Sequence, residues 1–241
     1  ELRLPECPTL YHHLLLSLRQ KDIIATFNWD PFLYDTWDYY KDAMPLPKII
    51  YLHGNVRIAY CDKHHSYGTK GTYCPECNKE FTPVPILYPI STKNYSNDPF
   101  ISSEWDRIKY GLREAIALTI FGYGAPKSDK EAFELMIKAW KDRSNREFET
   151  IEIIDTKDRQ SLIETWKPFM PTYHWQHVKN FYKSLIARYA RRSCEALYVS
   201  TVLGRFVEDY PFPKDIGFEE LMLWLKPLID AELASNLECR K

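Results

Sequence analysis

Residues 22–31, Asp-Ile-Ile-Ala-Thr-Phe-Asn-Trp-Asp-Pro, decide the fold class of this 241-residue chain. After Asp22 comes the apolar segment Ile-Ile-Ala-Thr. This segment is too short for a helix and is typical of a buried strand. A polar segment, Asn28 to Asp30, follows where that strand would end. Similar short apolar runs recur at residues 48–52, 115–121 and 150–154.

Helical patterns surround these runs, at residues 9–20, 102–114 and 128–141. Strands that alternate with helices favour parallel pairing through right-handed crossovers. The sequence therefore predicts an α/β domain over residues 1–157, with a Rossmann-like parallel sheet.

The chain changes character after this domain. Residues 158–241 carry helical patterns near 176–206 and 217–236, and we expect no strand among them. They are predicted to form a C-terminal helical extension.

Composition excludes several classes of protein. The net charge is −1, and the most basic stretch, Arg188 to Arg192, fits a solvated helical face, so we expect no nucleic-acid site. No apolar run reaches the ~20 residues that a membrane span needs. Six unevenly spaced cysteines do not make a disulfide scaffold in a chain of this length. These features favour a cytoplasmic protein without a membrane partner.

Two short knuckles predict a metal site within residues 58–82. Cys61 and His64 form the first, and Cys74 and Cys77 form the second, nine residues further on. Zinc prefers four nitrogen or sulfur ligands, and a closed protein set makes a structural site. His65 is the alternative to His64 as the fourth ligand.

A polar or glycine residue follows each predicted strand. Ligands of open parallel sheets bind beyond the carboxyl ends of the strands, so we expect these residues to share one site. Each also has a structural explanation: a helix cap before proline for Asp30, a turn for Asn28, a core position for His53. Their joint occurrence favours a site. Its members are Asn28, Asp30, His53, Gly122, Tyr123 and Asp155.

The order of these motifs resembles the sirtuin family. Thr26-Phe-Asn-Trp-Asp30 is similar to the sirtuin T-x-N-x-D motif, and Leu52-His-Gly54 to its L-H-G motif. The cysteine-rich insertion follows at the place where sirtuins carry zinc. Residues 90–95 and 121–129 resemble segments of the bacterial sirtuin-like branch linked to anti-phage defence.

This resemblance implies an NAD hydrolase that releases nicotinamide and ADP-ribose, acting in anti-phage defence. It implies that His53 is the general base and that Asn28 orients the ribose and the water. The other residues it places around NAD are Thr26, Asp30, Gly122, Tyr123 and Asp155. The implied partners, besides NAD, are further copies of the chain or a defence-system protein.

Departures from the family pattern keep other functions open. Deacylating sirtuins usually have Gln where this chain has Phe27, and no F-G-E segment follows. The glycine-rich strand, loop and helix that open the family are also missing, and we expect them upstream of Glu1. The alternatives are an NAD-dependent protein deacylase and a non-catalytic sensor or scaffold that binds NAD or ADP-ribose.

Overall fold

All four apolar runs form strands in the computed structural model, which describes residues 5–87, 98–142, 150–170 and 174–238. Strand β1 (Ile23–Thr26) pairs in parallel with β2 (Lys48–Tyr51). Strand β6 (Ala117–Phe121) pairs in parallel with β7 (Thr150–Ile154). Parallel strands joined by helices confirm the predicted α/β class.

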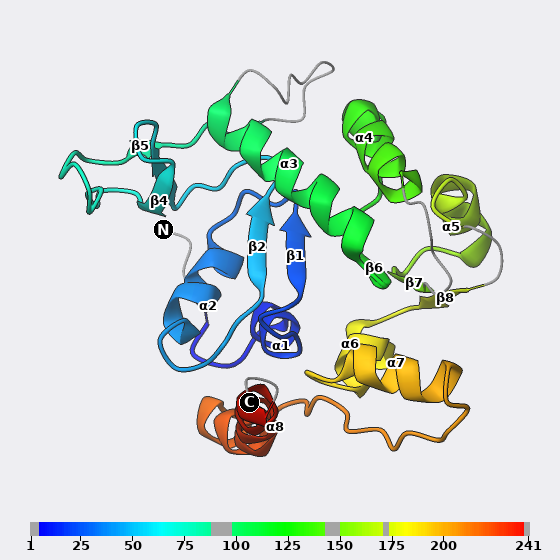
Figure 1. The fold of residues 1–241 in the computed structure, drawn as a ribbon. Coiled ribbons are helices and arrows are strands. Elements are labelled where there is room, and N and C mark those ends of the chain that lie inside the picture. Colours follow the sequence, from blue (N-terminus) through cyan, green and yellow to red (C-terminus); the bar gives the residue numbers. More distant parts are fainter. Residues whose placement is uncertain (1–4, 88–97, 143–149, 171–173, 239–241) are drawn as a thin grey trace. The chain divides into compact units, whose positions relative to one another are not determined.

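Helix α3 (Pro99–Glu114) covers the β1–β2 pair (Figure 1). The Asp98 carboxylate caps it by accepting the Ile101 N–H at 3.0 Å. Its buried face reaches β2, where the Glu104 carboxylate accepts the Tyr51 N–H at 2.7 Å. The Trp105 indole N–H donates to the Leu52 carbonyl at 3.3 Å. Helix α3 therefore fixes the strand end that precedes His53.

The expectation of no strand after residue 157 is wrong. Strand β8 (Trp175–Val178) pairs in parallel with β7 and extends the sheet to the order β6-β7-β8. Helix α4 (Lys130–Lys141) connects β6 to β7, and α5 (Arg159–Trp166) precedes β8. The four-residue strand escaped prediction because His174 and His177 have helical spacing, and only pairing with β7 makes the segment extended.

Neither edge of either parallel sheet has a further strand partner among the described residues. In that part of the chain β1 pairs only with β2, and β6 only with β7. Strands β1 and β6 are less buried than β2 and β7, with which they pair; Ile23 in β1 is 38% exposed. Strands of parallel sheets are normally covered on both faces, as β7 is here.

A small antiparallel sheet is inserted after β2. It has the order β4-β3-β5, with Tyr60 of β3 opposite both Tyr67 and Thr82. Its core is Ala59, Cys74 and Phe81. The strands are β3 (Ile58–Cys61), β4 (Ser66–Thr69) and β5 (Thr82–Pro83).

The chain divides into two compact units in a way the sequence does not predict. Residues 23–31 and 48–181 form the sheet-containing unit, which extends well past residue 157. The second, helical unit joins three separate segments, residues 1–22, 32–47 and 182–241. Its helices are α1 (Leu10–Leu16), α2 (Phe32–Tyr40), α6 (Leu185–Arg188), α7 (Ser193–Thr201) and α8 (Phe218–Glu238).

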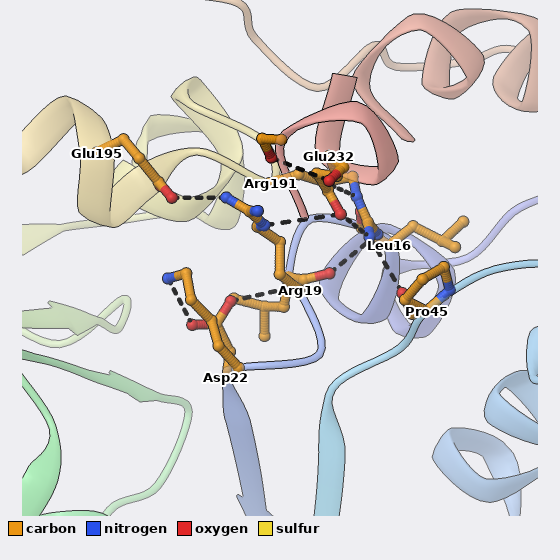
Figure 2. Close-up of polar contacts among 10 residues, drawn as sticks. Leu16, Arg19, Asp22, Pro45, Arg191, Glu195 and Glu232 are labelled. Carbon is orange, nitrogen blue, oxygen red and sulfur yellow. Dashed lines mark hydrogen bonds and ion pairs between the residues drawn. The ribbon is translucent and has the colours of Figure 1, made fainter. Parts of the chain in front are cut away.

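Arg191 holds the three segments of the helical unit together (Figure 2). Its side chain is fully buried and forms two hydrogen bonds to the Glu232 carboxylate of α8, at 2.6 and 2.8 Å. It also donates to the Leu18 and Pro45 carbonyls, at 3.0 and 3.1 Å. The residues after 182 thus form a joint core with the start of the chain, and not a separate appended domain.

One of the predicted motifs falls outside the ranges given above. The motif at residues 90–95 lies outside the described residues, so its role stays a prediction. In the described part of the chain no helix combines the length and the apolar character that crossing a membrane requires.

Candidate functional site

The carboxyl ends of β1 and β2 lie side by side. The Leu52 N–H donates to the Thr26 carbonyl at 3.0 Å, which continues the parallel ladder to the last residue before His53. On the other sheet, the Gly122 N–H donates to the Ile154 carbonyl at 3.1 Å. The predicted site residues thus follow paired strands, as the sequence pattern requires.

His53 is buried beside an acidic side chain. Its imidazole is 6% exposed, and its Nε2 lies 3.9 Å from Oδ1 of Asp129. Asp129 is 3% exposed and ends the short helix Lys127–Asp129 that leads into α4. The Tyr123 hydroxyl donates to its other carboxylate oxygen at 3.2 Å. The arrangement joins the ends of β2 and β6 through one carboxylate.

Phe27 packs against this group from the end of β1. Its ring is stacked on Tyr123 with the centroids 4.0 Å apart and the planes 8° from parallel. It also meets the His53 ring edge-on at a centroid distance of 4.9 Å. Phe27 therefore links the two sheets at their carboxyl ends and shields His53 from water. Electrostatic interactions of His53 are stronger in such a water-excluded environment than in solvent.

The backbone of the segment from Asn28 to Asp30 is held by hydrogen bonds to two side chains. The Asn28 N–H donates to Oγ1 of Thr26 at 3.0 Å, so the Thr26 side chain shapes this turn. Nδ2 of Asn55 donates to the Asp30 carbonyl at 2.7 Å. The Asn28 side chain remains exposed, free to meet a ligand from solvent.

Gly54 is required by close approach of the chain. It has a φ of +78°, and a Cβ there would lie 2.1 Å from the Pro85 carbonyl oxygen. The neighbouring Leu87 N–H donates to the His53 carbonyl at 3.0 Å. Residues 85–87 thus clamp the turn that carries His53.

A cavity of about 310 Å³ lies at the carboxyl ends of β6, β7 and β8. Gly122, Asp155 and Lys179 are among the residues that line it. Oδ1 of Asp155 accepts the Lys157 N–H at 2.9 Å, and the second carboxylate oxygen is left for another donor. The volume is at the lower end of the range for ligand pockets.

The structure gathers the four predicted zinc ligands into one cluster. The sulfur and nitrogen atoms of Cys61, His64, Cys74 and Cys77 all lie within 4.8 Å of one another. Nδ1 of His64 is 3.6 Å from the Cys61 sulfur and 3.3 Å from the Cys74 sulfur. Of the two candidate histidines, only His64 belongs to this group of described residues; His65 has a φ of +50° in the same turn.

The donor set fits zinc in chemistry and size. Ligands of a tetrahedral zinc bound at ~2.0–2.3 Å are separated by roughly 3.3–3.8 Å. The distance from Cys61 to Cys77 sulfur is 3.8 Å. The Ser66 hydroxyl, followed by backbone N–H groups of Cys77 and Glu76, lowers the pKa of the Cys74 thiol to about 6. The site is therefore prepared to present thiolate to a metal.

Two residues around His53 lay outside the predicted site. Asp129 was visible only as the last residue of the segment 121–129, where a carboxylate before a helix is most simply a cap. Asn55 follows Gly54 directly, yet its use as a clamp for Asp30 depends on a contact 25 residues away. Both roles depend on contacts between residues that are distant in the sequence, and no local sequence pattern reports such contacts.

The chain has low similarity to known proteins. No protein-family model and no curated protein matches it. Among solved structures, a Sir2 homologue in complex with NAD has 13% identity and a TM-score of 0.41, over 78% of this chain and 65% of that one. A Sir2 variant with deacetylated p53 peptide and 3′-O-acetyl-ADP-ribose has 14% identity and a TM-score of 0.34, over 66% and 60%. This chain thus spans less than two thirds of both structures.

Proposed function

We propose that this chain is the greater part of an NAD hydrolase, which cleaves the nicotinamide–ribose bond to give nicotinamide and ADP-ribose. The observation that carries the proposal is a buried His53 next to a buried Asp129, after the ends of β2 and β6. The cavity at the ends of β6, β7 and β8 includes Gly122 and Asp155 in its lining, but not His53. The resemblance of Thr26–Asp30 and Leu52–Gly54 to sirtuin motifs supports it.

The reaction needs a base and an ordered ribose. As the C1′–N bond breaks, its electron pair leaves with the nicotinamide ring, and the ribose carries oxocarbenium-like charge. Water then bonds to C1′ and must lose a proton. An imidazole suits that proton transfer at neutral pH. We assign the base to His53.

The remaining roles are assigned from the resemblance to sirtuin motifs, and the positions of the residues support them. Asn28 is exposed on a turn held by Thr26, and its amide can orient both a ribose hydroxyl and the water. Asp30, fixed by Asn55, faces the nicotinamide end in this proposal. Gly122 and Tyr123 approach the phosphates and ribose, and Asp155 accepts from the adenosine ribose in its cavity.

A second candidate is an NAD-dependent protein deacylase, which consumes an acylated peptide together with NAD. Phe27 favours hydrolysis over deacylation. Deacylating sirtuins usually have Gln before the motif's Asn, whereas this chain has Phe27 there, with its ring stacked on Tyr123. A non-catalytic sensor that binds NAD or ADP-ribose is the third candidate. The proposed setting is anti-phage defence in the cytoplasm, with further copies of the chain or a defence protein as partner.

The test is nicotinamide release from NAD by the full-length natural protein, quantified by chromatography with and without an acylated peptide. We expect release without peptide, and a loss of at least roughly 10²-fold in His53→Ala. The control is His174→Ala, whose exposed ring lies before β8 and should not matter. Release only with peptide indicates the deacylase. NAD binding without release in either condition contradicts hydrolysis and leaves the sensor.

A further inference from the structure

We propose that Asp129 is a positioning residue for His53, holding the imidazole in the orientation and tautomer that a base requires. The inference rests on the proposed function for its kinetic part, but the contact itself is a property of the fold. Residues from two strand ends, His53 after β2 and Tyr123 after β6, contact Asp129, which belongs to neither strand.

Burial gives the first argument. Taking a carboxylate out of water is costly unless charge or hydrogen bonds compensate it. Asp129 is 3% exposed, one oxygen accepts from Tyr123, and the other faces Nε2 of His53. The carboxylate therefore favours a proton on that ring nitrogen.

The consequence for catalysis concerns the other ring nitrogen. With N–H held at Nε2 by the carboxylate, Nδ1 keeps its lone pair and accepts the proton from water or a ribose hydroxyl. The imidazolium so formed is stabilised by the nearby Asp129 carboxylate. The 3.9 Å separation exceeds a hydrogen bond, and such contacts commonly shorten when substrate binds.

Tyr123 and Phe27 define the surroundings of the pair. The Tyr123 hydroxyl from the end of β6 restrains the carboxylate, and its ring stacks on Phe27 from the end of β1. Phe27 in turn contacts the edge of His53. Because two aromatic rings exclude water, the charge of Asp129 acts on His53 with little screening.

The first measurement is independent of activity. The titration of His53 is followed by NMR of ¹³C-labelled histidine, assigned with His53→Ala, in wild type, Asp129→Asn and Asp129→Glu. Removing the negative charge should lower the His53 titration midpoint by about one pH unit or more, and Glu should restore part of it. Asp142→Asn is the matched control, because Asp142 lies exposed at the far end of α4 and pairs with Arg113.

The second measurement is a double-mutant cycle on nicotinamide release. If Asp129 acts through His53, Asp129→Asn lowers kcat by at least roughly 10-fold with little change in KM, yet costs nothing further in a His53→Ala background. Tyr123→Phe keeps the stacked ring and should lower kcat by less. Asp129→Glu provides the variant that keeps the charge if Asn impairs folding.

The outcomes separate this inference from the proposed function. An unchanged His53 midpoint in Asp129→Asn overturns the positioning role, whatever the enzyme does. A shifted midpoint in a protein that never releases nicotinamide supports the contact and refutes the hydrolase. Equal losses in both backgrounds of the cycle reduce Asp129 to a structural residue.

Discussion

At the residue scale, His12 of α1 is a neutral histidine built into the helical unit. Its Nδ1 accepts the Thr9 N–H at 3.0 Å, closing the first turn, and its ring packs against Tyr40 and Phe218. Burial, and then the charge of His13, lower the pKa of His12 to about 4. Burial likewise lowers the pKa of His13, whose Nδ1 lies 2.7 Å from the Tyr182 hydroxyl.

These depressed pKa values predict acid sensitivity. In the unfolded chain His12 has its ordinary pKa of 6.5, so as the pH falls it binds a proton before folded His12 does. The stabilising contribution is therefore complete above pH 6.5 and is lost as the pH falls towards 4. We expect a loss on the order of 1 kcal/mol from His12 between pH 7.5 and 5, allowing for screening. His12→Gln preserves the cap and should flatten this dependence in urea unfolding. An equally steep loss in His12→Gln contradicts the assignment.

At the scale of one element, the β3-β4-β5 insertion depends on its metal. Among the described residues, the buried hydrophobic cluster of this sheet is Ala59, Phe81 and the ligand Cys74, which is too little apolar area to hold a small sheet without a further constraint. We predict one zinc per chain by elemental analysis. Chelation should remove hydrogen-exchange protection from this sheet while the β6-β7-β8 sheet stays protected.

A pair of adjacent histidines supplies the control for the metal site. His64→Asn removes a ligand and should reduce zinc content after dialysis, because Nδ1 of His64 belongs to the cluster. His65→Asn should retain the metal, since asparagine tolerates the positive φ of that position. Metal loss in both variants, or in neither, contradicts the assigned ligand set.

At the scale of the whole molecule, stability depends on one buried ion pair between distant segments. Arg191 has a φ of +62° and donates to Glu232 and to carbonyls of the two N-terminal segments (Figure 2). Arg19 extends the network to Glu195 at 2.6 Å. Deleting Arg191 would remove both hydrogen bonds to the buried Glu232 carboxylate and leave it only the more distant Arg19, whose Nε lies 3.6 Å away.

Arg191→Ala should therefore lower the free energy of unfolding by about 3–5 kcal/mol. Arg188→Ala is the comparison, because Arg188 makes a two-pronged but exposed pair with Asp209, worth about 1 kcal/mol or less. Both values come from urea unfolding of the full chain. Similar losses in the two variants would show that burial of the Arg191 pair adds nothing.

Local chemistry made much of the architecture predictable. Short β-branched runs that end in polar residues predicted β1, β2, β6 and β7. The length and burial of a strand can be predicted from consecutive residues. The zinc knuckles were readable from spacing alone, because close ligands need few residues between them. The NAD contacts stay predictions.

The sequence by itself determined the α/β class, the metal cluster and the positions of His53, Asn28 and Asp155 at strand ends. Only the tertiary structure decided that β8 joins β7, that Asp129 faces His53, and that residues after 182 pack with the start of the chain. Periodicity and spacing report neighbours within a few residues. Pairing across 24 to 175 residues depends on complementary burial and charge that no local window contains.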